Sequence, residues 1–281
     1  MPILNKDMQV CISLAARPSN LGTRFHNYLY DELGLNFIYK AFTTNDLEGA
    51  VRGIRALNFR GCSVSMPFKE AIIDFVDVMA PSALAIESVN TVVNDNGILT
   101  ASNTDFEAVL NLLQERKLDT SLPVLLRGSG GMAKAVVAAF KSAGFTDLTV
   151  VARNEAAGRS LASKYGFKFL PESELAAIAA DPEAGGFKVL VNVTPIGMDG
   201  ANANDLSFDI AIVENADVVV DVVAFPSETP LIKLAIELSK PFISGAEVIA
   251  LQAALQFEAY TGVRLSAEQV SRASAFSRLP A

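Results

Sequence analysis

The sequence predicts an α/β protein with two domains. Apolar stretches of strand length alternate with amphipathic stretches of helical spacing from about residue 8 onward, a pattern typical of βαβ units around a mostly parallel sheet. A second series of the same kind begins only near residue 122, so the 281 residues are best divided into two domains of ordinary size. Hydrophobic residues make up 51% of the chain and charged residues 19%, which suits sheets whose strands are buried on both faces.

The first series predicts an α/β domain that ends in a β-hairpin. Two apolar runs, 89–93 and 98–100, flank the turn Asn94-Asp95-Asn96-Gly97. Asn-Gly accommodates the positive φ angles that a tight hairpin turn needs, so we expect this hairpin to form an antiparallel edge of the first sheet. Before it, the pattern predicts strands at 8–14, 36–42 and 60–65, and helices at 22–33, at 45–57 and from about Phe68.

The second series predicts a domain of the same class, joined to the first by a helix from Asp105 to about Glu115. The segment 196–208 is rich in small and polar residues, which indicates a loop. Strands are expected at 122–127, 148–152, 187–193 and 217–223, and helices at 130–143, 154–165, 246–260 and 265–277.

The segment 122–140, LPVLLRGSGGMAKAVVAAF, predicts a strand, a phosphate-binding turn and a helix. Gly128 and Gly130 lack Cβ atoms, so the backbone can turn tightly and let a pyrophosphate approach the unpaired N–H groups at the start of the next helix. Ala133 stands where the fingerprint G-x-G-x-x-G/A needs a small residue for close packing of helix on strand. The flanking strand and helix favour a dinucleotide site over a plain strand-to-helix turn.

The cofactor's identity is predicted from the end of the next strand. An acidic residue there, about 20 residues past the glycines, would bind the ribose 2′-hydroxyl of NAD. The chain has Arg153-Asn154 instead. A guanidinium can pair bidentately with a 2′-phosphate, so we expect NADP, with NAD as the alternative. The competing interpretation of Arg153 is an exposed side chain at a strand end.

The charge and composition exclude several classes of partner. The formal net charge is −8, which argues against nucleic acid or an anionic membrane as a partner. No apolar run approaches the roughly 18 residues of a membrane span, and the first residues lack the pattern of a secretory signal. Cys11 and Cys62 lie in apolar runs, which is typical of buried thiols in a cytoplasmic protein. The spacing of His and Cys residues does not suggest a metal site.

Three further stretches contain candidates for chemistry, each with an ordinary structural alternative. In 63–70, SVSMPFKE, Pro67 starts a helix and puts Lys69 in its first turn, where the helix dipole disfavours a cation; the alternative is an exposed Lys. The sequence Asn-Thr-Asp at 103–105 equally suits a helix N-cap. In 192–198, NVTPIGM, the alternative is a turn built on Pro and Gly.

His26 is the only histidine in the chain. It lies within a predicted helix, in Arg24-Phe25-His26-Asn27-Tyr28, and nothing near it in the sequence completes a catalytic relay. We therefore expect it to pack against the helix's neighbours, or to be partly exposed, rather than to catalyse a reaction.

Together and in order, these motifs resemble those of the shikimate dehydrogenase family, from Cys11 to about Thr261. SVSMPFK is similar to the strand-turn-helix that carries the family's catalytic Lys, and ESVNT and ASNTD are similar to its two asparagine motifs. GSGGMAKA is similar to its nucleotide loop, VARN to its NADP-selecting turn, NVTPIGM to its nicotinamide-side loop, and SGAEVIALQAALQFEAYTG to its glutamine-bearing helix. Seven motifs in one order are far more specific than any one of them.

The resemblance implies a reversible, NADP-linked oxidation of a ring hydroxyl on a cyclic hydroxy acid, such as shikimate (to 3-dehydroshikimate) or quinate. The reaction would take place in a cleft between an N-terminal α/β substrate domain and a Rossmann-type NADP-binding domain. Lys69 and Asp105 match the family's catalytic pair. The chemistry agrees, because hydride leaves carbon only if a base takes the hydroxyl proton.

The remaining site positions are also carried over from the resemblance. Asn90, Asp105 and Gln252 match residues that bind the ring hydroxyls. The cofactor-binding positions are Gly128, Ser129, Gly130, Gly131, Met132, Ala133, Arg153, Asn154 and Thr194, with Val222 and Gly245 lining the nicotinamide.

The chain departs from the family pattern at three places. Residues 18–23, PSNLGT, replace the His-Ser-x-Ser-Pro motif whose serines hold the substrate carboxylate. Ala224 stands where the family has Tyr, and Ser63-Val64-Ser65 where it has Asn-Val-Thr. A lost hydroxyl donor to a buried carboxylate costs about 1–3 kcal/mol, so these changes, which resemble the shikimate dehydrogenase-like branch, predict an altered substrate preference. The candidates for substrate contact in these segments are Ser65 and, for the acid group, Asn20, Ser19 or Arg17.

The expected division of the chain is a substrate domain at 1–104, completed by 247–281, and an NADP-binding domain at 105–246. Two other functions stay open. A sensor or scaffold that binds NADP without turnover is disfavoured because the proton-transfer pair is present, and a methyltransferase is disfavoured by Arg153, since its adenosyl ligand has no 2′-phosphate. The sequence leaves the oligomeric state open between monomer and homodimer.

Overall fold

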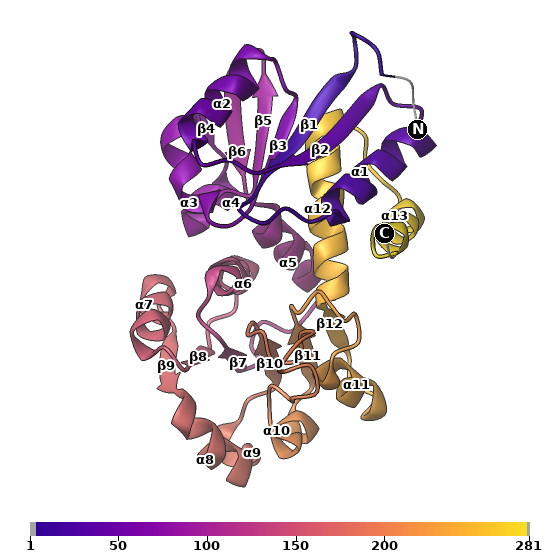
Figure 1. Ribbon diagram of the computed structural model, residues 1–281. Coiled ribbons are helices and arrows are strands. Elements are labelled where there is room, and N and C mark those ends of the chain that lie inside the picture. Colours follow the sequence, from indigo (N-terminus) through magenta and orange to yellow (C-terminus); the bar gives the residue numbers. More distant parts are fainter. Residues whose placement is uncertain (1–3, 280–281) are drawn as a thin grey trace. The chain divides into compact units, whose positions relative to one another are not determined.

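The computed structural model describes residues 4–279 and confirms the predicted α/β class (Figure 1). The chain forms two compact units. The first holds the described residues up to Thr104 together with those from Ala250 on, and the second holds Asp105–Ile249. Each unit contains one six-stranded sheet with helices on it.

The first sheet has the strand order β2-β1-β3-β5-β6-β4. Strands β1, β2 and β3 are parallel, whereas β5 runs antiparallel to both β3 and β6. The hairpin turn has the expected positive φ angles, 53° at Asn96 and 92° at Gly97. The strands are β1 (Gln9–Leu14), β2 (Phe37–Phe42), β3 (Gly61–Val64), β4 (Val78–Met79), β5 (Thr91–Asp95) and β6 (Ile98–Ser102).

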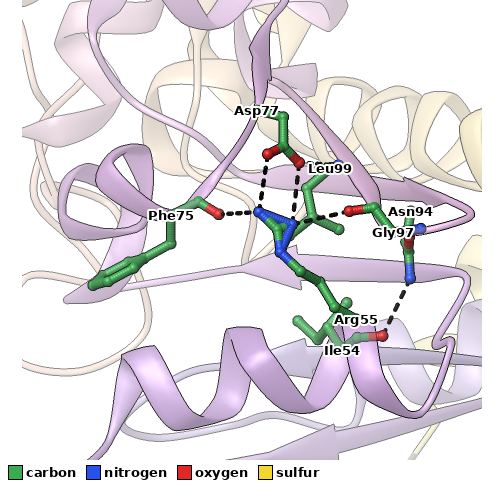
Figure 2. Close-up of polar contacts among 7 residues, drawn as sticks. All are labelled: Ile54, Arg55, Phe75, Asp77, Asn94, Gly97 and Leu99. Carbon is green, nitrogen blue, oxygen red and sulfur yellow. Dashed lines mark hydrogen bonds and ion pairs between the residues drawn. The ribbon is translucent and has the colours of Figure 1, made fainter.

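The expectation that the hairpin forms the edge of this sheet is wrong. The short strand β4 pairs in parallel with β6 and takes the outer position. Arg55 is one reason that so short a strand holds its place, as Figure 2 shows. Its guanidinium donates to the Asp77 carboxylate at 3.1 and 3.2 Å, to the Phe75 carbonyl at 2.8 Å and to the Gly97 carbonyl at 3.1 Å, and Asp77 accepts from Leu99 N at 2.7 Å. A charged side chain from a helix thus ties β4 to the hairpin.

Helices cover both faces of the first sheet, and successive side chains along each strand point to opposite faces. On one face Ile12 and Cys62 pack against α2 and the turns around Ile72. On the other face Cys11 packs with side chains of α1, α12 and α13, which lie together in Figure 1. The helices are α1 (Leu21–Glu32), α2 (Leu47–Ala56), α3 (Phe68–Ala71), the 3-10 turn η1 (Ile72–Phe75), α4 (Pro81–Ile86), α12 (Gly245–Thr261), which begins in the second unit, and α13 (Ala267–Ser277).

The second sheet is parallel throughout, with the order β12-β11-β10-β7-β8-β9. Its central strands are buried on both faces, and Val124, Leu125 and Leu126 of β7 are fully inaccessible. Their continuous apolar run is what such a position requires. The strands are β7 (Val124–Arg127), β8 (Leu148–Ala152), β9 (Lys168–Pro171), β10 (Val189–Asn192), β11 (Val218–Asp221) and β12 (Phe242–Ser244).

Two helical layers sandwich this second sheet as well. Leu125 and Val151 face a cluster formed with α8, α10 and α11. Ala152 faces the other side, where a Cβ added at Gly158 of α7 would lie 3.0 Å from the Ala152 Cβ, and α6 lies next to α7. The helices are α5 (Thr104–Glu115), α6 (Gly131–Ala143), α7 (Glu155–Tyr165), the 3-10 turn η2 (Glu172–Glu174), α8 (Leu175–Ala180), α9 (Pro182–Gly185), α10 (Ile210–Asn215) and α11 (Pro230–Glu237).

The predicted strands and long helices lie within two residues of their observed ends, and the loop at 196–208 is confirmed. The strands β4, β9 and β12 and the short helices α4 and α8–α11 were not predicted. Within residues 4–279, none of the helices has the length and apolarity that crossing a bilayer requires.

Candidate functional site

The glycine loop after β7 has, at its first glycine, a backbone that only glycine supports. Gly128 has a φ of 125°, and a Cβ there would lie 2.8 Å from Val193 Cγ2 and 2.9 Å from the Val193 carbonyl oxygen. At Gly130 and Gly131 a Cβ would meet nothing within 4 Å, so the backbone at the start of α6 faces open space. Exposed N–H groups at a helix start fit the phosphates of a dinucleotide.

A cavity of about 490 Å³ lies beside this loop. Six of the predicted cofactor positions line it: Gly128, Ser129, Gly130, Arg153, Asn154 and Thr194. The other lining residues are Arg127, Ala152, Glu172, Val193, Pro195, Ile196, Asn202 and Asp205. The structure therefore brings the ends of β7, β8 and β10, which are far apart in the sequence, to one cavity at the carboxyl edge of the sheet.

The other predicted cofactor positions are absent from the lining of this cavity. Ala133 is fully buried, as a residue at the contact between helix and strand should be. Gly245 starts α12, and a Cβ there would lie 2.1 Å from the Val223 carbonyl oxygen. Val222 is half-buried and its N–H donates to the Asn192 carbonyl at 3.1 Å. Gly131 and Met132 form the first turn of α6.

Arg153 and Asn154 follow β8 and are both exposed. The Asn154 side chain accepts a hydrogen bond from Ala157 N at 3.1 Å and caps α7. Its oxygen is therefore used within the protein, which leaves the Arg153 guanidinium as the charged group of this turn that can meet a ligand.

Thr194 is held by a buried polar cluster that the sequence did not reveal. Asn192 Oδ1 accepts from Thr194 N at 3.0 Å and from Thr194 Oγ1 at 2.7 Å, and Asn192 Nδ2 donates to Asp221 Oδ1 at 3.0 Å. Burial raises the pKa of Asp221, while hydrogen bonds from Thr229, Val223 and Asn192 act in the opposite direction. Asn192 and Asp221 end the adjacent strands β10 and β11, whose other residues are all valine or leucine. A polar residue directly after three apolar ones was the signal that the sequence offered.

In the first unit, Asn90 lies next to the carboxyl end of β3, where Val64 N donates to the Asn90 carbonyl at 2.8 Å. Its side chain is 3% exposed. Asn90 Oδ1 accepts from Thr91 Oγ1 at 2.8 Å and from Thr104 N at 2.8 Å, and Asn90 Nδ2 donates to Thr104 Oγ1 at 3.0 Å. The side-chain amide of Asn90 is thus held in place. Its oxygen already accepts hydrogen bonds, whereas the second hydrogen of its NH₂ group takes part in none of these bonds.

Within the first unit, Gln252 and the turn that carries Lys69 are linked to Asn90 through its neighbours. Thr104 Oγ1 donates to Gln252 Oε1 at 3.3 Å. Lys69 is half-buried, and its carbonyl accepts from Val89 N at 2.8 Å, which ties the turn that carries Lys69 to the residue before Asn90. Asp105 is half-buried, follows Thr104 directly and is the first residue of the second unit.

Ser63 is the centre of a second polar cluster behind Asn90. Ser63 Oγ accepts from Tyr39 Oη at 2.8 Å, donates to Gln256 Oε1 at 2.9 Å and lies 3.0 Å from Tyr260 Oη. A hydroxyl has one donor and two acceptor sites, so Ser63 is saturated. Gln256 Nε2 in turn donates to the Asn90 carbonyl at 3.2 Å and to Thr91 Oγ1 at 3.0 Å. Sequence spacing did not identify Gln256, because these partners are 165 and 166 residues away.

The substrate candidates Ser65 and Asn20 are both exposed, as are Ser19 and Arg17. Ser65 follows β3 and its backbone N–H donates to the Leu14 carbonyl at 2.9 Å. Asn20 precedes α1 and its side chain makes no capping hydrogen bond. Both side chains are therefore accessible to a ligand.

His26 is fully buried, so of the two expected placements, packing against the helix's neighbours or partial exposure, the structure shows the first. Its ring stacks on Tyr39 with centroids 4.5 Å apart and on Phe257 at 6.1 Å. Burial lowers the pKa of His26 to about 3, although Gln256 acts in the opposite direction. The imidazole is therefore neutral at ordinary pH.

Comparison with known proteins links these two sets of residues to one family. The family model of the shikimate dehydrogenase substrate binding domain matches residues 19–92. The shikimate dehydrogenase-like protein of Haemophilus influenzae is 54% identical over 98% of this chain and 99% of its own. The shikimate dehydrogenase (NADP(+)) of Chlorobaculum tepidum is 32% identical over 88% of each chain. The structure of shikimate 5-dehydrogenase from Thermus thermophilus, in complex with NADP(H) and shikimate, is 26% identical, with a TM-score of 0.82 over 96% of this chain and 100% of that one.

Proposed function

The chain belongs to the shikimate dehydrogenase family, and from this premise we propose that it is an NADP-linked oxidoreductase that reversibly oxidises the ring hydroxyl of shikimate, to 3-dehydroshikimate, or of a related cyclic hydroxy acid such as quinate. The observation that carries the proposal is the cluster of Asn90, Thr104 and Gln252 beside the turn that bears Lys69. Such a cluster of oriented amides and hydroxyls suits a ligand with several hydroxyl groups.

In this proposal Lys69 and Asp105 form the catalytic pair. Lys69 Nζ takes the proton of the substrate hydroxyl during oxidation and returns it during reduction, since one group must serve as base in one direction and as acid in the other. Asp105 orients Lys69 and accepts a hydrogen bond from a substrate hydroxyl. NADP, when bound, accepts or supplies the hydride.

The remaining roles divide between the two units. Asn90 offers its second amide hydrogen to a ring hydroxyl, and Gln252 and Ser65 bind further substrate oxygens. The acid group is assigned to Asn20, which is exposed and makes no capping bond, with the exposed Ser19 and Arg17 as alternatives. The backbone from Gly128 to Ala133 would hold the pyrophosphate, and Arg153 the 2′-phosphate, with Asn154 and Thr194 beside them and Val222 and Gly245 next to the nicotinamide.

The replaced serine motif at 18–23 supports a substrate preference different from that of the NADP(+)-dependent shikimate dehydrogenases. In addition, the saturated hydroxyl of Ser63 has no hydrogen-bonding site left for a substrate. We therefore place the contact to the acid on α1 and its preceding turn.

The buried free thiols of Cys11 and Cys62 fit the proposed cytoplasmic location.

The test is a panel of NAD and NADP crossed with shikimate and quinate. Thermal unfolding should show stabilisation by NADP and a further shift with the preferred acid, because stabilisation follows ligand occupancy. The same mixtures should show formation of reduced cofactor. Stabilisation by NADP without turnover on either acid would support the binding-only sensor instead. No stabilisation by either nucleotide would contradict the proposal.

A further inference from the structure

Arg127 is an unexpected residue for its place. It ends β7, whose preceding side chains are fully buried and apolar, and it directly precedes Gly128. Its side chain is only 16% exposed. Burying a charged side chain costs free energy unless the charge is paired and hydrogen-bonded. The partners of the Arg127 guanidinium therefore bear on its role.

Those partners are Glu172 and a loop carbonyl. Arg127 Nε donates to Glu172 Oε1 at 3.0 Å, Nη2 donates to the same oxygen, and Nη1 donates to the Ser207 carbonyl. Glu172 begins η2, directly after β9. The three bonds fix the plane of the guanidinium. Within residues 4–279, Glu172 Oε2 makes no hydrogen bond, so this oxygen remains an acceptor.

Both members of this pair line the same cavity as the glycine loop and Arg153. Under the proposed function the loop holds the pyrophosphate and Arg153 the 2′-phosphate. The adenine base is joined to the ribose that carries this 2′-phosphate, so the part of the cavity that these residues leave is within its reach. The remaining lining consists of Arg127, Ala152, Asn154, Glu172, Val193–Ile196, Asn202 and Asp205.

We propose that the Arg127–Glu172 pair recognises the adenine base of the dinucleotide, with Glu172 Oε2 accepting a hydrogen bond from the 6-amino group and the guanidinium plane supporting the ring. This inference rests on the proposed NADP-linked function. An ionised carboxylate can only accept hydrogen bonds, and bonds to a charged group are the stronger kind. The planar guanidinium stacks on aromatic faces.

The same arrangement discriminates against other purines. A base with an oxygen in place of the 6-amino group would set that oxygen against the Glu172 carboxylate, and neither atom can donate. A repulsive contact of this kind gives specificity as effectively as an attractive one. The pair therefore selects a 6-aminopurine dinucleotide over its 6-oxopurine analogue.

Asp205 provides the matched control, because it is the other carboxylate in the lining of this cavity. It is exposed, and its backbone N–H donates to the Asn202 carbonyl at 3.2 Å. The hydrogen bonds of the Arg127 guanidinium go to Glu172 and Ser207 instead. Replacing Asp205 removes one negative charge from the cavity without changing the Arg127–Glu172 pair.

The experiment compares the dissociation constants of NADP and of its hypoxanthine analogue by calorimetry, for the wild type, Glu172→Gln and Asp205→Asn. The wild type should bind NADP about 10- to 100-fold more tightly than the analogue, the range expected for one lost hydrogen bond that leaves a polar atom unpaired. Glu172→Gln should bring this ratio close to one, because an amide can donate to the 6-oxygen and still accept from Arg127. Asp205→Asn should keep the wild-type ratio.

Equal binding of the two nucleotides by the wild type would overturn this inference while leaving the NADP-linked function in place. The inference would also be overturned if Glu172→Gln kept the wild-type ratio or if Asp205→Asn lost it. A wild type that binds neither nucleotide would contradict the proposed function itself. The comparison within the wild type needs no variant, so it holds even where a variant folds poorly.

Discussion

The cluster around Asn90 and the glycine loop at Gly128 lie at the carboxyl ends of parallel strands, β3 and β7, yet they are built in opposite ways. The first consists of side chains that satisfy one another, with Asn90, Thr104 and Gln256 joined by hydrogen bonds. The second consists of backbone whose shape depends on the lack of side chains. Loss of a single polar atom should therefore lower the stability of the cluster around Asn90. Addition of a single methyl group should impair the glycine loop, in its stability or in its binding of the nucleotide.

The largest effect on stability is expected from Gly128→Ala. The added methyl would meet the Val193 carbonyl at 2.9 Å on a backbone with φ of 125°, so the free energy of unfolding should fall by about 2 to 4 kcal/mol. Urea unfolding measures this. The control is Gly130→Ala, where φ is −79° and the methyl would meet nothing within 4 Å. It should keep wild-type stability but bind NADP more weakly, because the methyl enters the space that the phosphates need. A Gly128→Ala protein as stable as the wild type would contradict the account of the loop.

The next effect is expected from Gln256→Leu, which tests the side-chain cluster. Leu has a similar size but leaves Ser63 Oγ and Thr91 Oγ1 without the partners that Gln256 provides. The free energy of unfolding should fall by about 1 to 3 kcal/mol, and the KM for the acid should rise because the support for Asn90 is lost. Gln114→Leu, on the exposed surface of α5, is the control and should change stability by less than about 0.5 kcal/mol. If both substitutions changed the free energy of unfolding by the same amount, the hydrogen bonds of Gln256 would not contribute to stability beyond those of an exposed glutamine.

A smaller and more selective effect is expected from Arg153→Gln. Loss of the guanidinium should weaken NADP binding about tenfold, as for one charge-assisted contact at an exposed site, and should leave NAD binding unchanged. Calorimetry with both nucleotides measures the difference. Arg159→Gln removes an exposed charge from α7 that pairs with Glu155, and it should affect neither nucleotide. If Arg153→Gln weakened both nucleotides equally, Arg153 would not be the residue that selects the 2′-phosphate.

The smallest effect concerns His26 and pH. Burial lowers its pKa to about 3 in the folded protein, whereas the unfolded chain has a value of about 6.5. Between these two values the unfolded chain binds a proton that the folded chain does not, so the free energy of unfolding falls as the pH is lowered. From pH 7 to pH 5.5 the loss should be about 1 kcal/mol.

The matched variant is His26→Phe, which keeps a ring between Tyr39 and Phe257. The chain has no other histidine, so the difference between variant and wild type isolates this group. Denaturant unfolding at the two pH values should show a smaller loss in the variant. The same pH dependence in both proteins would mean that His26 is not buried as the structure has it.

How much of this could be predicted from the sequence differs between the two regions. The strand, loop and helix at the glycine site are continuous in the chain, so their local pattern identified them. The hydrogen bond between Gln256 and Asn90 spans 166 residues, and no periodicity connects such positions. Asn90 and Gln252 were carried over only by the family resemblance, whereas the structure shows which of their atoms are occupied.

Several short strands and helices were not predicted for a similar reason. Strands β4 and β12 contain two and three residues, too few for an alternating pattern, and β9 ends in Pro171, which suits only an edge strand. Tertiary contacts such as those of Arg55 hold these elements in place. Arg127 was visible as a charge in an apolar run, but its partner, Glu172, lies 45 residues away.

The central claim is that Lys69 moves the proton while the glycine loop and its cavity hold the nucleotide. The most direct measurement combines turnover and NADP affinity in Lys69→Met, with whichever of shikimate and quinate the wild type oxidises. We expect kcat to fall about 10²- to 10⁴-fold, the usual contribution of general acid–base catalysis, while the dissociation constant of NADP stays within about twofold of the wild-type value. A variant that turns over as fast as the wild type would contradict the assignment.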